Sequence, residues 1–386
     1  MASVEISRLL LLSLLSTTYG LPYFDEDWSP RQIREYFIQR AAEQARPRLD
    51  VGFNLDGQGV GQVSGVDVDS NGDLYVFHRA DRPWTAETYV MFTNVLSEDA
   101  KVPISSDVIY KVDPKTGKLT HSFGKDFFNV PHGLKIDQHD NIWVTDVGRH
   151  QVFRFPKGAT RPDLELGEKF VPGSDEKHFC KPTDVAVASN GDFFVSDGYC
   201  NNRILKFSSS GQIIALWGDR EGSYTLTPSS LNIPHSITLI EELDLVCVAD
   251  RENSRALCYN AGLNNKTSIG TFNRTLIPQG DMGKVYAIYY DKADKEMVAA
   301  GLLSEYPLRS GDGSDIYPAR AFTYNLEGKQ LISWAFITPD VARNGPSLIH
   351  DLCASRDGRD FYLADLDQKT VYKYTKNWST AVTQQQ

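Results

Sequence analysis

The sequence predicts an all-β protein, a six-bladed β-propeller in which each blade is a sheet of four antiparallel strands. Two observations support this fold class. A Gly, Asn or Asp turn followed by alternating apolar residues recurs along the chain, as at 71–78, 140–146, 190–197 and 358–365. Internal repetition of this kind is typical of propellers and other repeat folds. Aromatic residues also make up 11% of the 386 residues, which favours strands over helices.

The spacing of the repeats sets the number of blades. A short strand opens each unit, and the matching positions are residues 64, 132, 183, 235, 286 and 350, in steps of 68, 51, 52, 51 and 64 residues. A second strand follows and usually ends in Asp, as at Asp146, Asp197, Asp250 and Asp365. A β-solenoid is the alternative, but its rungs are much shorter than these units.

Composition excludes several classes of protein. The chain is 41% hydrophobic and 23% charged, a globular balance rather than a disordered or collagen-like one. Its 40 basic and 50 acidic residues give a net charge of −10, and no basic patch stands out. We therefore expect no nucleic-acid partner.

The ends of the chain predict a targeting segment and a tail. Arg8 precedes the apolar run 9–15, and the small residues Thr18 and Gly20 follow, so residues 1–20 are expected to be a signal peptide rather than a buried N-terminal helix. The run is too short to span a bilayer, and no later stretch is long and apolar enough. We expect residues 21–50 to be a lead-in segment, 51–376 the propeller, and 377–386 a polar tail.

Other sequence features suit a secreted protein or one in the lumen of the secretory pathway. Three Asn-x-Ser/Thr sites, at Asn265, Asn273 and Asn377, predict glycosylation. The five cysteines contain no C-x-x-C pair, which disfavours a thiolate zinc site. Pairing of neighbours in sequence predicts the disulfides Cys180–Cys200 and Cys247–Cys258, and Cys353 is expected to be a buried free thiol.

Three histidines occupy one register of the repeat. His132, His235 and His350 open the first strand of units two, four and six, and that strand lines the central channel of a propeller. Alternate blades of a six-bladed ring are related by roughly 120°, so the three imidazoles are expected to meet on the axis. Three His ligands with a fourth position open are typical of catalytic zinc. The alternative is that each His only caps its strand.

A second register brings cations and a phenol to the same mouth of the channel. Arg79, Tyr199 and Arg251 come just after second strands, next to the start of the first strands. Two guanidinium groups beside a metal predict an anionic substrate group such as a carboxylate, and Tyr199 is a candidate base. The alternatives are ion pairs of Arg79 with Asp81 and of Arg251 with Asp250 or Glu252, and a packing role for Tyr199.

A hard-oxygen site is a further candidate. Strand alternation directs Asp351 away from the zinc site, and the backbone carbonyls of Val66 and Leu134 lie at the matching inner-strand position. Ligands of this kind suit calcium.

Several motifs together resemble one enzyme family. The runs Val130-Pro-His-Gly-Leu134, His178-Phe-Cys-Lys-Pro-Thr-Asp-Val-Ala-Val187, Val195-Ser-Asp-Gly-Tyr-Cys200 and Cys247-Val-Ala-Asp-Arg-Glu-Asn253 are similar to peptidyl-α-hydroxyglycine α-amidating lyase, a six-bladed propeller of the NHL-repeat type. The resemblance spans about residues 50–375 and is most specific in the second and third of these runs.

The resemblance implies a reaction and a site. A peptide ending in α-hydroxyglycine is cleaved at the N–Cα bond to give a peptide amide and glyoxylate, a step in peptide hormone maturation. It implies that the three histidines bind zinc, that Tyr199 is the base, and that Arg79 and Arg251 hold the carboxylate. It also implies a calcium site at Val66, Leu134 and Asp351, and the same two disulfides.

The resemblance has one departure and carries further expectations. Leu348 stands where the family usually has Met, which bears on the shape of the substrate pocket. A separate copper monooxygenase is expected to supply the hydroxylated peptide, and the protein is expected to be a monomer. The competing functions are a calcium-dependent lactonase or esterase of another six-bladed type, whose sites rely on Asp, Asn and Glu, and a non-catalytic NHL binding scaffold.

Overall fold

The computed structural model describes residues 46–91, 93–218, 226–280, 282–302, 308–309, 315–316, 319–334 and 348–376. The predicted signal peptide, residues 21–45 of the lead-in, Asn377 and the tail lie outside these residues. Within them, no helix has both the length and the apolar character needed to cross a membrane.

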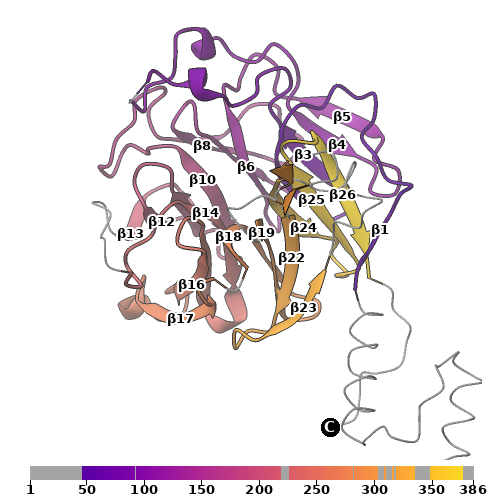
Figure 1. The fold of residues 1–386 in the computed structure, drawn as a ribbon. Coiled ribbons are helices and arrows are strands. Elements are labelled where there is room, and N and C mark those ends of the chain that lie inside the picture. Colours follow the sequence, from indigo (N-terminus) through magenta and orange to yellow (C-terminus); the bar gives the residue numbers. More distant parts are fainter. Residues whose placement is uncertain are drawn as a thin grey trace, which may run out of the picture. The chain divides into compact units, whose positions relative to one another are not determined.

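Six four-stranded antiparallel sheets confirm the predicted fold class (Figure 1). Blade one is β2 (Val63–Val68), β3 (Leu74–His78), β4 (Ile109–Val112) and β5 (Leu119–Phe123). Blade two is β6 (Pro131–Ile136), β7 (Ile142–Asp146), β8 (Gln151–Phe155) and β9 (Leu164–Leu166). Blade three is β10 (Pro182–Val187), β11 (Phe193–Asp197), β12 (Arg203–Phe207) and β13 (Ile213–Trp217).

The second half of the ring repeats this arrangement. Blade four is β14 (Pro234–Ile240), β15 (Leu245–Asp250), β16 (Arg255–Asn260) and β17 (Phe272–Ile277). Blade five is β18 (Lys284–Asp291), β19 (Glu296–Leu302), β22 (Ala319–Tyr324) and β23 (Gln330–Trp334), with a two-stranded ribbon of β20 (Leu308–Arg309) and β21 (Asp315–Ile316) inserted. Each predicted opening position lies in an innermost strand.

The last blade combines both ends of the propeller. Its strands are β24 (Ile349–Ala354), β25 (Asp360–Asp365) and β26 (Thr370–Thr375), and its outer strand is β1 (Arg48–Leu49). Arg48 pairs with Thr375 and Leu49 with Tyr374, as Figure 1 shows beside the yellow strands. The sheet therefore begins before residue 51, because an early strand closes the ring.

The hydrophobic core lies between blades. Six clusters of buried side chains each join two neighbouring blades; one joins Leu245 and Cys247 of blade four to Val285 and Met297 of blade five. Alternation of apolar residues along each strand puts one apolar set on either face of a blade, so each blade packs against both neighbours.

The Asp that ends most second strands holds the segment before the next inner strand. Asp146 accepts hydrogen bonds from the backbone N–H of Asn129 and Val130 at 2.7 and 3.0 Å. The corresponding bonds run from Cys180, Asn232 and Leu348 to Asp197, Asp250 and Asp365. This repeated contact fixes the chain two or three residues before the channel-lining position in blades two, three, four and six.

In blade one a histidine replaces this Asp. His78 is fully buried, and its Nδ1 accepts hydrogen bonds from the N–H of Gly61 and Ala80 at 3.3 and 3.0 Å. Burial lowers the pKa of His78 to about 4, so the ring stays neutral and keeps this acceptor. His78 therefore has a local hydrogen-bonding role.

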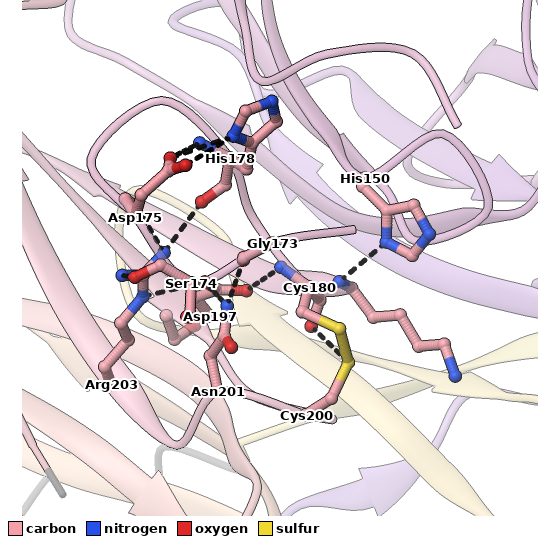
Figure 2. Close-up of polar contacts among 12 residues, drawn as sticks. His150, Gly173, Ser174, Asp175, His178, Cys180, Asp197, Cys200, Asn201 and Arg203 are labelled. Carbon is pink, nitrogen blue, oxygen red and sulfur yellow. Dashed lines mark hydrogen bonds and ion pairs between the residues drawn. A yellow bond between two sulfur atoms is a disulfide. The ribbon is translucent and has the colours of Figure 1, made fainter. Parts of the chain in front are cut away.

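The segment that precedes blade three is fixed by charge and by a disulfide (Figure 2). Asp197 also accepts bonds from Asn201 and from Arg203 Nε, and the Arg203 guanidinium donates to the carbonyls of Ser174, Asp175 and His178. The Cys180–Cys200 disulfide ties this segment to the turn that carries Tyr199. These contacts fix the position of the turn that carries Tyr199.

The cysteines pair as predicted. Cys180–Cys200 and Cys247–Cys258 are disulfides, and Cys353 is a buried free thiol. Disulfides are typical of oxidising compartments. Asn265 and Asn273 are both exposed; their glycosylation stays a prediction.

We expect the Cys247–Cys258 bond, which joins directly opposed residues of β15 and β16, to stabilise blade four. Replacing both cysteines with Ala should lower the free energy of unfolding by about 3 kcal/mol, because a loop with a separation of 11 residues is no longer closed in the unfolded chain. Denaturant unfolding measures this difference. The Cys353→Ala variant is the control, since it keeps both bonds and should still lose stability in reductant. An unfolding midpoint of the wild type that reductant leaves unchanged would contradict this role.

Candidate metal centre and active site

Three histidines meet at the centre of the ring. His132, His235 and His350 lie on β6, β14 and β24 and are buried, and their nearest ring nitrogens all lie within 4.8 Å of one another. The ring centroids are 5.0, 4.5 and 4.6 Å apart. The structure thus brings together residues that are 103 and 115 positions apart in the sequence (235 − 132 and 350 − 235).

A bulge at the same place in each inner strand directs these side chains. The register between first and second strands shifts around residues 64, 132, 183, 235, 286 and 350 in all six blades. A residue at a bulge leaves the regular pairing, so its side chain can be re-aimed. Strict strand alternation, which we used to place Asp351, is therefore interrupted beside His350.

Backbone carbonyls of the odd-numbered blades orient the three rings. His132 Nδ1 lies 2.8 Å from the Thr183 carbonyl, His235 Nδ1 lies 2.7 Å from that of Tyr286, and His350 Nδ1 lies 2.7 Å from that of Ser64. A carbonyl oxygen only accepts, so each Nδ1 must carry the proton. In a neutral ring Nε2 then keeps its lone pair, and it faces the other two histidines.

The close approach of neighbouring blades makes these bonds possible. A Cβ on Gly133, the residue after His132, would lie 2.4 Å from the Thr183 carbonyl oxygen. Only glycine fits there. The Pro-His-Gly motif of blade two therefore combines a ligand candidate with the contact that orients it.

The environment keeps the three rings uncharged. Burial lowers the pKa of His132 and of His235 well below the usual range, and His350 lowers each further. Arg79 and Arg251 add to the effect at His132, and Arg251 and His132 add to it at His235. Burial, together with Arg79, lowers the pKa of His350 to about 3. Neutral imidazole is the form that binds a metal, so the site suits a divalent cation.

Tyr199 lies against this cluster. Its hydroxyl is 3.0 Å from His132 Nε2, 3.3 Å from His235 Nε2 and 3.4 Å from Arg251 Nη1. Its ring packs edge-on against His132, with a centroid distance of 5.4 Å. Tyr199 therefore does pack against a neighbouring ring, as the alternative interpretation expected. Its hydroxyl also makes polar contacts with the two histidines and Arg251.

Arg79 presents an unpaired donor. The side chain is only 2% exposed, and Nε donates to the Pro131 carbonyl and Nη1 to Gln62 Oε1, but Nη2 has no hydrogen-bond partner among the residues that the structure describes. Burial lowers the pKa of Arg79 to about 10, which leaves it a cation at neutral pH. Asp81 is exposed, and the ion pair between them is not formed. A buried guanidinium N–H without a partner suits an anionic ligand.

Arg251 makes the ion pair that we considered as its alternative role, and it also reaches the site. Its Nε lies 2.9 Å from Glu252 Oε1, while its guanidinium lies 5.3 Å from the Tyr199 ring and 5.0 Å from the Tyr286 ring. Burial opposes the charge of Arg251, but Tyr199, Tyr286 and Glu252 outweigh it and raise its pKa.

The deeper layer of the channel holds two acidic side chains. Asp351 Oδ2 accepts a bond from the N–H of Val66 at 2.9 Å, and Asp184 Oδ2 accepts one from the N–H of Ile237 at 3.0 Å. Burial and the neighbouring Asp184 raise the pKa of Asp351 well above its usual range; burial raises that of Asp184 to about 6. Leu134 lies on β6, against Gly65 of β2, the residue before Val66.

Three residues near the site were not predicted to be part of it from the sequence: Tyr286, Trp84 and Gln62. Tyr286 shares the register of the histidines and could have been suggested by it. Trp84 lies 4.9 Å from the Tyr199 ring, and Gln62 binds Arg79. Trp84 belongs to the connection that makes the first repeat step long, which was the only signal available. Leu348 is half-buried two residues before His350.

Comparisons with known proteins bear on this site. A family model of the NHL repeat matches residues 128–155 and 179–207, the inner three strands of blades two and three. The chain is 42% identical over 342 residues to peptidyl-alpha-hydroxyglycine alpha-amidating lyase 2 of Drosophila melanogaster, covering 86% of this chain and 77% of that protein.

Two longer relatives are similar over a smaller part of their length. Lyase 1 of Drosophila melanogaster is 38% identical over 323 residues, 82% of this chain and 57% of that protein. Peptidylglycine alpha-amidating monooxygenase of Rattus norvegicus is 38% identical over 357 residues, 90% of this chain but 34% of that protein. The match to Drosophila lyase 2 extends over most of both proteins, and the chain therefore belongs to the peptidyl-α-hydroxyglycine α-amidating lyase family.

Proposed function

We propose that this protein is a zinc-dependent lyase that cleaves the N–Cα bond of peptidyl-α-hydroxyglycine, giving a C-terminally amidated peptide and glyoxylate. The observation that carries the proposal is the convergence of three neutral imidazoles beside Tyr199 and beside Arg79 Nη2, which has no hydrogen-bond partner in the described part of the chain. Membership of the family supports the reaction type.

The donor set fits a zinc ion. His132, His235 and His350 would hold it through Nε2, because each Nδ1 is bound to a carbonyl. Three protein ligands leave a fourth position for substrate, as in catalytic zinc sites. When bound, zinc would act as a Lewis acid toward a substrate oxygen. The histidine set does not match the Asp, Asn and Glu ligands of a calcium-dependent lactonase.

The protein's own residues supply binding and proton transfer. Arg79 Nη2 and the Arg251 guanidinium would bind the substrate carboxylate, and Tyr199, in its phenolate form beside these cations, would take the proton of the α-hydroxyl. The O–H electron pair then forms the carbonyl of glyoxylate while the N–Cα bond breaks. The leaving amide nitrogen would take this proton back from Tyr199, which returns to the phenolate, so the reaction is balanced without an oxidant or reductant.

A second cation would occupy the deeper layer. We assign calcium to Asp351 and the carbonyls of Val66 and Leu134. The proximity of the Asp351 and Asp184 carboxylates supports this assignment, since two neighbouring acids deep in a protein ionise together only beside positive charge. Lys135, which pairs with Asp67 at 3.3 Å, supplies one such charge.

The proposed reaction has a place in peptide hormone maturation. Its substrate requires prior hydroxylation of a C-terminal glycine, which is monooxygenase chemistry, and we propose a separate copper monooxygenase for that step. The disulfides support an oxidising compartment, consistent with secretion. We propose that the protein works as a monomer.

Metal analysis tests the ligand set directly. Wild-type protein should contain about one zinc per chain, and His235→Ala should lose most of it, because two imidazoles bind far more weakly than three. His121→Ala is the matched control, since His121 is exposed on β5. Calcium measured in the same samples should persist in His235→Ala. Zinc content that His235→Ala leaves at the wild-type level would refute the site.

Tyr199→Phe tests the base. The variant should keep zinc and lose about 10²–10⁴-fold in kcat, because only the proton acceptor is removed. Glyoxylate release from an α-hydroxyglycine peptide measures turnover, and metal analysis shows whether the site is intact. A variant with wild-type kcat would exclude Tyr199 as the base.

Arg79→Lys tests carboxylate recognition. The shorter, non-planar ammonium cannot reproduce the Nη2 donor, so kcat/KM for the free acid should fall about 10–100-fold, as for loss of a charged hydrogen bond. The methyl ester of the same substrate should be affected much less. Discrimination between acid and ester that stays at the wild-type ratio would count against this role. Zinc content and thermal unfolding show whether the variant is folded.

A further inference from the structure

The connection between β3 and β4 carries a tryptophan to the edge of the site. Trp84 is half-buried, and its ring lies 4.9 Å from the Tyr199 ring and 6.4 Å from the His132 ring. The Arg79 guanidinium lies 5.3 Å from the same ring. One aromatic surface thus borders the candidate base, a candidate metal ligand and the candidate carboxylate-binding group.

The backbone of Trp84 is fixed to Arg79 through one side chain. Gln62 Oε1 accepts hydrogen bonds from the Trp84 N–H and from Arg79 Nη1, both at 2.9 Å. The distance between the tryptophan and the guanidinium is therefore set by a shared acceptor rather than by side-chain packing alone.

A small apolar cluster supports the ring. Trp84 and Tyr199 both pack against a group formed by Tyr89, Leu96, Ala100, Val130 and Val147. The Trp84 and Tyr89 rings are 5.6 Å apart. With this support the surface is preorganised, which lowers the entropy cost of binding a ligand side chain.

The segment that precedes blade three, which the Cys180–Cys200 disulfide joins to the Tyr199 turn, also contacts the connection between β3 and β4. Lys181 Nζ lies 3.8 Å from the centre of the Tyr89 ring and 3.1 Å from Asn94 Oδ1. His150 Nε2 lies 3.1 Å from the Asn94 carbonyl, and its Nδ1 accepts a hydrogen bond at 3.1 Å from the N–H of Lys181, the residue after Cys180 (Figure 2). The same part of the molecule therefore positions both Tyr199 and the Trp84 connection.

We propose that Trp84 forms the binding surface for the side chain of the residue before α-hydroxyglycine, and that it favours aromatic and large apolar residues there. The inference rests on the proposed function. When Arg79 binds the substrate carboxylate and Tyr199 contacts the substrate α-hydroxyl, the α-hydroxyglycine lies between two side chains that Trp84 borders. The preceding Cα is about 3.8 Å farther along the peptide, so its side chain comes within reach of the exposed part of the ring.

The chemistry of the surface sets the preference. An indole face binds aromatic and aliphatic side chains by burying apolar area and by ring contacts. Arg79 and Arg251 give the neighbouring site a positive charge, but both guanidinium groups are committed to the terminal carboxylate. An acidic side chain at the preceding position would lose hydration against the indole without gaining a free cation.

Two matched substrates test the inference: acetyl-Phe-α-hydroxyglycine and acetyl-Ala-α-hydroxyglycine. Wild-type protein should favour the Phe substrate about tenfold or more in kcat/KM, mainly through a lower KM. Trp84→Ala should reduce the preference to about twofold by raising KM for the Phe substrate, while Trp84→Phe should keep a substantial part of it. Val102→Ala, in the same connection and 62% exposed, is the control and should leave both substrates unchanged.

The readouts separate a specificity role from a positioning role. If Trp84 acted only through Arg79, Trp84→Ala would weaken both substrates equally and would also reduce discrimination against the methyl ester; that result would overturn the inference. Equal kcat/KM for the two substrates in the wild type would also overturn it and would leave the lyase function intact. If the wild type released glyoxylate from neither peptide, the proposed function would fail, and the inference with it.

Discussion

The hydrogen bond between a histidine Nδ1 and a carbonyl of the next blade is the interaction on which the site depends. Three such bonds, to Thr183, Tyr286 and Ser64, select the tautomer whose lone pair faces the axis. They form because bulged inner strands, and in blade two also Gly133, let neighbouring blades approach closely. The chemistry of the centre is thus a consequence of how blades pack, and the packing is set by apolar alternation in every strand.

Much of the fold and of the histidine cluster could be predicted from the sequence, because both follow from the repeat. A propeller places equivalent positions at equivalent places around one axis, so His132, His235 and His350 could be brought together from their register alone. The same logic located Arg79, Tyr199 and Arg251 at the ends of second strands. Cysteine pairing followed because the partners lie on one hairpin or on adjoining turns.

The remaining features depend on irregular structure, which a repeat does not encode. Trp84 and Gln62 reach the site through connections of individual length, and nothing in their local sequence indicates the contact. The Glu252 partner of Arg251 was one of two candidates that spacing could not separate. The bulge beside His350 interrupts the alternation from which the direction of Asp351 was inferred. The strand Arg48–Leu49 is too short to show a period, yet it completes the last blade.

The alternation of roles around the ring explains why this centre suits a six-bladed propeller. Even-numbered blades contribute an imidazole, and the odd-numbered blades contribute the carbonyl that orients it. Alternation of two roles closes on itself only if the number of blades is even. Four blades would offer two imidazoles, too few for a three-ligand site, and eight would place four around a wider channel. Six is the smallest ring in which three histidines and their three anchoring carbonyls alternate, and in this ring the Nε2 atoms of His132 and His235 lie next to the Tyr199 hydroxyl.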